Sequence, residues 1–262
     1  MDLCLGIIFL GWGMCCGSFV NMLVYRTAIK YKILKIKRAD TGVRPYNKNR
    51  SFCDYCGRQL KWYENIPVIS WLIQKGKSRC CGRKLPTEYP IIEIVTGILF
   101  LIMGGNGIPP LQMLVGLVII TLLVFNTVFD WKYMILPDFS TYILIGIAVV
   151  MLILGGNENQ PLQNILSAVG AGLFLLFLHL ITKGKGMGIG DVKLAVFMGL
   201  FLGWPQVLVA IYIAFIVGAI VGVVLIIKKK IKRKSLIPFG PFLIWGTIIV
   251  WWGGEKILKL IN

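Results

Sequence analysis

The chain has 262 residues, of which 57% are apolar and 15% are charged, and its mean hydropathy is +0.78. Soluble domains carry about half apolar and about a quarter charged residues, so this composition excludes an ordinary soluble domain, a disordered chain and a disulfide-rich secreted module. The formal charge of +17 would suggest nucleic acid in a soluble protein, but here the basic residues lie between apolar runs. The sequence therefore predicts a polytopic membrane protein, and no nucleic-acid partner is expected.

Eight apolar runs have a length that lets a helix cross, or nearly cross, the hydrocarbon core of a bilayer. They cover roughly residues 3–25, 89–104, 109–129, 139–155, 162–182, 190–203, 206–227 and 236–254. The strict alternation that marks a transmembrane barrel is missing from these runs. We therefore expect an all-α membrane protein with about eight transmembrane helices.

The 28 Lys and Arg residues are distributed very unevenly along the chain. Sixteen lie in residues 26–88, and all the others except Lys256 and Lys259 fall on the same side of the predicted spans. The positive-inside bias makes that side cytosolic and places both termini outside. The basic run at residues 228–234 then serves as an anchor on anionic lipid. The resulting division of the chain is a first transmembrane helix (1–25), a cytosolic Cys-containing module (26–88) and a seven-helix domain (89–262).

Four cysteines of the cytosolic module have the residue type and spacing of a metal site. Cys53 and Cys56 form a zinc knuckle pattern, in which two thiolates three residues apart lie on a tight turn before a glycine. The second half is irregular, because Cys80 and Cys81 are adjacent. Cys81 precedes a glycine as Cys56 does, so it is the better third ligand, and Cys80 is a candidate for the fourth. A structural Zn²⁺ and a metal-free thiol cluster both remain open, since a reducing compartment disfavours disulfides.

Two aspartates next to predicted spans are candidates for function. Asp130 closes the third span, where the negative end of the helix dipole disfavours a carboxylate. Asp191 follows the stretch 184–190, in which every second residue is a glycine. Helix capping can explain Asp191 but not the glycines, which give a backbone that an extended chain can approach closely. Asp138, by contrast, has the position of an N-cap before the fourth span.

Asp130 and Asp191 are expected on the same membrane face, where they are candidates for a catalytic pair. Two carboxylates within about 3 Å cannot both ionise and share one proton. The ionised member can activate a water that attacks an amide, while the protonated member assists the leaving amine. The sole histidine, His179, lies among Leu and Phe in a span and is interpreted as an interior residue. Lys193 is interpreted as a lysine at a helix entrance or as a partner that steadies Asp191.

Motifs spread from the first span to the last occur in a single order. Residues 184–194 contain a Gly-x-Gly-Asp element, and residues 129–138 contain the other aspartate motif. Further motifs lie at 17–21, 65–71, 89–93 and 238–242. Together they resemble the type IV prepilin peptidases, a family of intramembrane aspartyl proteases. The resemblance covers nearly the whole chain.

The resemblance implies a bifunctional enzyme of the bacterial cytoplasmic membrane with its active site facing the cytosol. It would cleave the leader of type IV prepilins and pseudopilins after a glycine, with Asp130 and Asp191 as the catalytic pair. It would then methylate the new N-terminus with S-adenosyl-L-methionine. Gly76 and Lys77 match the family's Gly-Lys element and are candidates for binding this donor, or they form only a turn. Ser78 stands where family members usually have a cysteine.

The substrate would lie with its apolar helix in membrane lipid and its cleavage point extended across the two acids. Prolines and a glycine interrupt regular helix at residues 238–241 and form either the other wall of a cleft or a simple turn. The expected substrate-binding residues are Gly186, Gly188, Gly190, Pro238, Gly240 and Pro241.

Two other classes of function remain as alternatives. A proton-coupled membrane transporter would use Asp130 and Asp191 as a proton relay, with acids near the middle of the bilayer and inverted repeats. A non-catalytic pilus-assembly membrane factor would use the thiol module to hold a partner. Substitution of either aspartate by asparagine separates both alternatives from a protease.

Overall fold

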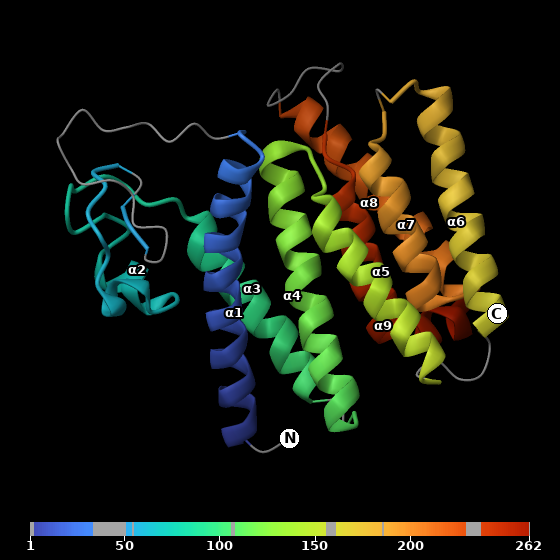
Figure 1. The fold of residues 1–262 in the computed structure, drawn as a ribbon, viewed down its shortest axis with the longest axis horizontal. Coiled ribbons are helices and arrows are strands. Elements are labelled where there is room, and N and C mark those ends of the chain that lie inside the picture. The colour runs from blue at the N-terminus through green and yellow to red at the C-terminus, as the bar shows by residue number, and fades with distance from the viewer. Residues whose placement is uncertain are drawn as a thin grey trace. The chain divides into compact units, whose positions relative to one another are not determined.

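The computed structural model describes residues 3–33, 51–53, 55–105, 108–155, 161–184, 186–228 and 237–261 (Figure 1). Within these residues the regular secondary structure is helical and no strand is formed. The long helices are α1 (Leu3–Lys30), α3 (Glu88–Gly104), α4 (Pro110–Tyr133), α5 (Asp138–Ile153), α6 (Pro161–Ile181), α7 (Ile189–Leu202), α8 (Gln206–Ile227) and α9 (Gly240–Ile261). Each of the eight predicted spans corresponds to one of these helices, so the all-α fold class is confirmed.

The long helices have the composition of a multi-pass membrane protein. Four of them, α1, α4, α6 and α8, are long and apolar enough to cross a membrane, and α5 is a shorter apolar helix. Large apolar side chains on α6 and α8 face outward, among them Leu166, Phe177 and Ile220. Such surfaces are typical of contact with lipid. The predicted basic anchor at 228–234 lies, apart from Lys228, outside the described residues.

The chain forms two compact units, residues 1–125 and 126–262, and the boundary falls within α4. In the first unit α1 packs against α3. Small residues permit this approach, because a Cβ at Gly13 would lie 2.8 Å from the Gly97 Cα, and one at Gly17 would lie 2.8 Å from the Glu93 Cα. The four-residue spacing of Gly13 and Gly17 thus forms a helix-packing face.

Between α1 and α3 the first unit contains a short segment with a 3₁₀ helix, η1 (Trp62–Asn65), and a single helical turn, α2 (Ile69–Ile73). Glu93 in α3 accepts a hydrogen bond from the backbone N–H of Val68, at 2.7 Å. Val68 has a positive φ of 58°. The Glu93 carboxylate therefore holds a strained loop of this segment against the membrane helices, and that role explains its burial.

In the second unit α7 is the central helix, because it packs against α5, α6 and α9 (Figure 1). Its residues are buried almost without interruption from Leu194 to Leu202. Gly199 allows the closest approach, since a Cβ there would collide with the backbone of Ala168 in α6. The N-terminus of α7, which carries Asp191, is therefore fixed by helices on several sides.

Candidate functional site

Asp130 lies in the last turn of α4 and is only 5% exposed. The backbone N–H of Gly240 faces the Asp130 carboxylate, and no side chain among the described residues donates a hydrogen bond to its Oδ2. A buried carboxylate with few hydrogen-bond donors costs free energy, and a carboxylate at the C-terminus of a helix meets the negative end of the dipole. Neither packing nor capping accounts for an acid at this position.

Asp191 is the third residue of α7 and is 6% exposed. Its Oδ2 accepts a hydrogen bond from the backbone N–H of Gly188 at 2.9 Å. A carboxylate is favourable at the positive end of a helix, so Asp191 caps α7. It also interacts electrostatically with Asp130 and with His179. The structure thus brings the two predicted aspartates together, although they are 61 positions apart in the sequence.

Two glycines and one leucine surround this acid pair. A Cβ at Gly240 would lie 2.6 Å from the Asp130 Oδ2, so a larger residue at this position would have to displace that carboxylate. A Cβ at Gly190 would lie 2.8 Å from the Cβ of Leu136. A Cβ at Gly240 would lie 3.2 Å from the Cδ1 of the same leucine. Leu136 therefore fills the space that the two glycines leave. Close packing within the protein is sufficient to explain why glycine occupies positions 190 and 240.

The other predicted substrate-binding residues have different surroundings. Gly186 and Gly188 are exposed, while Pro238 is half-buried and Pro241 is buried. The expectation that residues 238–241 cannot form regular helix is wrong in part, because α9 begins at Gly240. A proline is tolerated in the first turn of a helix, where the N–H that it lacks would have no intrahelical partner.

Asp138 does not have the predicted capping role. The N-cap of α5 is Pro137, and no side chain caps the helix. The Asp138 carboxylate instead forms an ion pair with the Lys193 ammonium at 2.6 Å. Lys193 also lies 5.0 Å from the centre of the Tyr142 ring. The interpretation of Lys193 as a partner of Asp191 is therefore replaced by a link between α5 and α7.

His179 has a definite hydrogen bond. Its ring Nδ1 lies 2.7 Å from the carbonyl oxygen of Met187, within the segment that leads into α7. The histidine is half-buried, which agrees with its interpretation as a hydrogen-bonded interior residue. This contact also holds the backbone just before Gly188, the N-cap of the helix that carries Asp191.

Sequence analysis missed two buried polar residues of the second unit, Asn126 and Ser140. Both are fully buried, and the Ser140 hydroxyl donates a hydrogen bond to the Asn126 Oδ1 at 2.5 Å. A signal was present, because Asn126 is a polar residue in an apolar run, one helical turn before Asp130.

The Cys-containing module consists of two loops with the same backbone pattern. In the first, the Cys53 N–H donates to the Arg58 carbonyl and the Gly57 N–H donates to the Cys53 carbonyl. In the second, the Ser78 N–H donates to the carbonyl of residue 83, and the N–H of residue 82 donates to the Ser78 carbonyl. Gly57 and its counterpart at 82 both have a positive φ, of 70° and 67°. Ser78 therefore occupies in the second loop the place that Cys53 occupies in the first.

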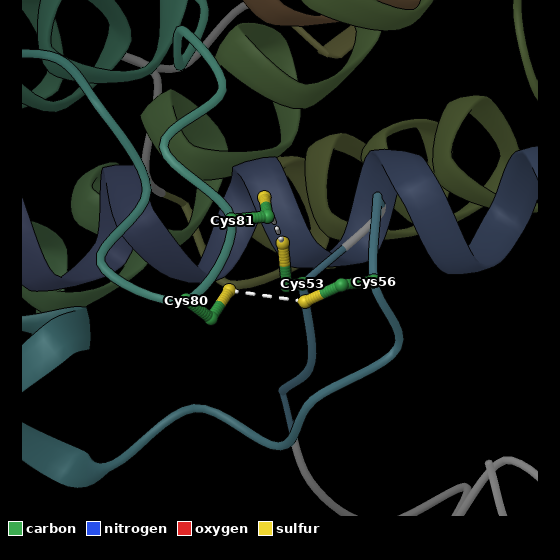
Figure 2. A group of neighbouring side chains, drawn as sticks. All are labelled: Cys53, Cys56, Cys80 and Cys81. Carbon is green, nitrogen blue, oxygen red and sulfur yellow. Dashed lines mark hydrogen bonds between the residues drawn. The ribbon is translucent and has the colours of Figure 1, made fainter. Parts of the chain in front are cut away.

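The four cysteine side chains point toward one another from these two loops (Figure 2). All four Sγ atoms lie within 4.8 Å of one another. The Cys56 and Cys80 sulfurs are 3.1 Å apart, and those of Cys53 and Cys81 are 3.9 Å apart. Thiolates clustered in this way form the donor set that tetrahedral Zn²⁺ prefers. The residues present fit a metal ion, and the adjacent cysteines both belong to the cluster.

Hydrogen bonds and burial shift the pKa values of Cys53 and Cys80 in opposite directions. Burial disfavours the Cys53 thiolate, yet bonds from the Ser78 hydroxyl and from the backbone N–H groups of Tyr55 and Cys56 lower the pKa of Cys53 to about 6. Burial raises the pKa of Cys80 to about 12, and its bonds with Cys56 and Cys53 act in the same direction. One thiolate is thus available at neutral pH to begin coordination of a metal.

Gly76 and Lys77, the candidates for the methyl donor, lie just before the second loop. Gly76 is buried with a φ of 67°, and a Cβ there would lie 2.9 Å from the Trp71 ring. Its N–H donates to the Trp71 carbonyl and its carbonyl accepts from the Leu85 N–H. These contacts account for Gly76 as a turn residue. Lys77 is exposed.

Comparisons with known proteins agree over most of the chain. The sequence profile of the bacterial peptidase A24 N-terminal domain matches residues 12–105, and that of the type IV leader peptidase family matches residues 117–223. No solved structure matches the chain significantly.

Several curated proteins are similar to this chain over nearly their whole length, and each is named prepilin leader peptidase/N-methyltransferase. The protein from Aeromonas hydrophila is 32% identical over 254 residues, which cover 90% of this chain and 87% of that protein. The protein from Bacillus subtilis (strain 168) is 32% identical over 215 residues, covering 80% and 84%. The protein from Neisseria gonorrhoeae is 29% identical over 266 residues, covering 95% and 91%.

Proposed function

Because the chain belongs to the prepilin leader peptidase/N-methyltransferase family, we propose that it cleaves the leader peptide from type IV prepilins and pseudopilins as an intramembrane aspartyl endopeptidase. The cut would follow a glycine at the cytosolic face of the bacterial cytoplasmic membrane, with both termini of the enzyme outside. The catalytic residues of this proposal are Asp130 and Asp191.

One observation carries the assignment of the acids. Asp130 and Asp191 come from different helices, are both almost fully buried, and lie within electrostatic reach of each other. Structural carboxylates are normally paired with a cation or fully hydrogen-bonded. In contrast, no side chain among the described residues donates a hydrogen bond to the buried Asp130 Oδ2. An acid pair of this kind is suited to sharing a proton and holding a water molecule.

The chemistry then follows from the two protonation states of the pair. The ionised carboxylate accepts a proton from water as the water oxygen attacks the amide carbon. The protonated carboxyl donates a hydrogen bond to the amide oxygen, which becomes negative as the tetrahedral intermediate forms. When the C–N bond breaks, the amine leaves with a proton from the pair, and the carboxylates return to their shared-proton state.

The substrate backbone would be held next to the exposed part of the glycine segment. Gly186 and Gly188 are exposed, whereas Gly190 is packed against Leu136. An extended peptide can add to exposed backbone through main-chain hydrogen bonds, and glycines leave room for it. The substrate's apolar helix would remain in lipid beside the outward-facing surface of α6 or α8.

The positions of the acids do not favour the proton-coupled transporter. Asp130 is in the last turn of α4 and Asp191 in the first turn of α7. A proton relay is expected near the middle of the bilayer, whereas these acids lie at helix ends.

The test is cleavage of a co-expressed prepilin by the full-length protein and by Asp130→Asn and Asp191→Asn. We expect both variants to leave the precursor uncut while the protein still accumulates in membranes. Asp138→Asn is the matched control, because Asp138 is an exposed aspartate of the same region that pairs with Lys193. Normal trimming by either the Asp130 or the Asp191 variant would reject the acid pair.

We also propose that the protein N-methylates the new N-terminus with S-adenosyl-L-methionine, and that Cys53, Cys56, Cys80 and Cys81 hold a structural Zn²⁺. The relatives' names support the first activity, and the thiol cluster supports the metal. Mass spectrometry of the mature pilin, with an added CH₂ group at the N-terminus, tests the methylation. Cleaved but unmethylated pilin from the fully active enzyme would reject it.

A further inference from the structure

The segment between the two cysteine loops contains an apolar face that the described residues leave uncovered. Within α2, the side chains of Ile69, Leu72 and Ile73 are 54%, 60% and 63% exposed. Their spacing of three and four residues places them on one face of the helix. Single apolar residues at a surface need no explanation, but three that share one helical face indicate a contact with an apolar partner.

The level of this segment relative to the membrane follows from the packing of α1 against α3. Residues 3–25 carry no charge, and a span of about 20 residues placed anywhere in them keeps Gly17 about 8 Å or more inside the end nearer Arg26. Gly17 packs against α3, since a Cβ there would lie 2.8 Å from the Glu93 Cα. Glu93 is therefore inside the hydrocarbon core as well, five residues after α3 begins at Glu88.

The buried Glu93 carboxylate fixes α2 at the edge of that core. It accepts a hydrogen bond from the N–H of Val68, the N-cap of α2, at 2.7 Å. Side chains in a helix lean toward its N-terminus, so this carboxylate extends from α3 toward the nearer membrane surface. Because a glutamate side chain is shorter than the depth of Glu93, the first turn of α2 lies at the boundary of the hydrocarbon core rather than in open water.

The backbone of the segment meets the condition that this level imposes. The N–H groups of Ser70, Leu72 and Gln74 donate to the carbonyls four residues earlier. Those of Lys75 and Gly76 donate to carbonyls of α2 and close the turn that follows it. Next to lipid, a backbone N–H without a partner is costly, because no water replaces the missing bond. The segment is therefore suited to contact with lipid.

The charges next to α2 are those of a helix at a membrane surface. Residues 65–87 contain five basic and no acidic residues, and Lys75 and Lys77, just after α2, are both exposed. An apolar face next to basic side chains is typical of a helix that lies among lipid headgroups, where anionic lipids attract Lys and Arg. Charge and hydrophobicity thus indicate the same partner.

We propose that α2 is an interfacial membrane helix, with Ile69, Leu72 and Ile73 inserted among the acyl chains of the leaflet next to the C-terminus of α1. In the proposed topology this is the cytosolic leaflet. The inference requires only that the first unit spans a membrane, and it does not depend on the proposed reaction. The second cysteine loop begins at Ser78, five residues after α2, so the helix keeps the thiol cluster close to the membrane surface. The module 26–88 is then partly embedded in lipid rather than wholly cytosolic.

Photo-crosslinking in a bilayer tests the position of Leu72. The full-length protein with p-benzoylphenylalanine in place of Leu72 is placed in nanodiscs of phosphatidylethanolamine and phosphatidylglycerol, irradiated and examined by mass spectrometry. The excited benzophenone attacks C–H bonds, which acyl chains have and water lacks. We expect a yield of lipid adduct within about 3-fold of that from the same probe at Phe177, a residue on the outward-facing surface of α6 that is 60% exposed.

Gln59 is the matched control within the same module. It is an exposed polar residue of the first cysteine loop, next to the exposed and charged Arg58. We expect the probe in place of Gln59 to give at least about 10-fold less lipid adduct than the probe in place of Leu72, because only an inserted side chain reaches the acyl chains.

Two results would overturn the inference. Equal yields of lipid adduct at positions 59 and 72 would mean that α2 is no closer to lipid than the rest of the module. Adducts of position 72 with protein alone, whether with the second unit, another copy of the chain or a prepilin, would assign the apolar face to that partner. If the variant at Leu72 fails to accumulate, the probe replaces Ile69 or Ile73, for which we expect the same ratio to Gln59.

Discussion

Lys193, two residues after Asp191, directs its ammonium to Asp138 rather than to the neighbouring acid of its own helix. Asp138 begins α5 and Lys193 belongs to α7, so the ion pair ties the segment that follows Asp130 to the helix that carries Asp191. The pair is partly exposed, with the Asp138 side chain 58% and the Lys193 side chain 26% accessible. An exposed ion pair contributes about 1 kcal/mol or less to stability.

The first prediction is that Asp138 and Lys193 contribute to stability only through the ion pair that they form with each other. Asp138→Asn and Lys193→Met should each lower the unfolding temperature slightly and leave cleavage within about 5-fold of native, consistent with a surface interaction. The double variant should be no worse than either single one, which a double-mutant cycle on thermal unfolding measures. Additive losses would mean that the two residues act independently.

Gly240→Ala should lower the rate of cleavage by about 100-fold. The added Cβ would lie 2.6 Å from the Asp130 Oδ2 and 3.2 Å from Leu136, so the carboxylate or the N-terminus of α9 must move. Displacement of a catalytic group by about 1 Å can cost about 100-fold in rate. Gly146→Ala on α5 is the control, because a Cβ there meets nothing within 4 Å. We expect it to be neutral or slightly stabilising, and equal activity in the two variants would contradict the packing argument.

Because the two loops of the Cys module share one backbone pattern, we predict that a cysteine at position 78 can replace Cys80 as a metal ligand. Ser78 has the backbone position of Cys53, and its Oγ lies 3.0 Å from the Cys80 sulfur. The double variant Ser78→Cys with Cys80→Ser should therefore retain bound Zn²⁺, whereas Cys56→Ser should lose it. Metal analysis of the purified proteins measures the content, and Co²⁺ spectra report the number of thiolates. Loss of metal in the double variant would show that Cys80 cannot be replaced from position 78.

Glu64 is predicted to stabilise the first loop of the module at neutral pH. It accepts hydrogen bonds from the Lys61 N–H at 2.8 Å and from the Arg58 guanidinium at 2.9 Å. The Lys61 bond, followed by Arg58, holds the pKa of the Glu64 carboxyl below its usual value. A lowered pKa means that the stabilisation is complete above the unfolded value of about 4.3 and is lost as the pH falls through the lower folded value.

Hydrogen exchange of residues 55–65 in Glu64→Gln tests this contribution. At pH 7 the variant should exchange faster than the native protein, because the bond to a charged acceptor becomes a weaker neutral one. Gln74→Glu on the neighbouring turn provides the control for an altered charge. Unchanged exchange at pH 7 in Glu64→Gln would mean that the metal site alone holds the loop.

The sequence was sufficient for features that depend on local pattern. Apolar runs located all eight long helices, and the cysteine spacing identified Cys53, Cys56, Cys80 and Cys81 as one group. The contacts around the acids were not predictable in this way. The partner of Lys193 lies 55 positions away, and Leu136 meets Gly190 and Gly240 from a separate loop. Such contacts depend on how helices distant in sequence pack, which periodicity does not encode.

Two predictions about the starts of helices were wrong, one for Asp138 and one for Pro241. Asp138 has the sequence position of a cap, but the Lys193 ammonium provides its carboxylate with a charged partner. Pro241 was expected to disrupt helix, yet its position in the first turn of α9 makes its missing N–H harmless. For Asp138 a tertiary neighbour decided the outcome, whereas for Pro241 its place within the helix did.

Leu136 acts as a spacer, since one aliphatic side chain separates the backbone beside Asp130 from the backbone beside Asp191. Its bulk, rather than any chemistry of its own, is what both glycines pack against. Truncation of Leu136 would therefore loosen the backbone next to both acids at once, and a loss of activity in such a variant would reflect lost packing rather than a missing reactive group.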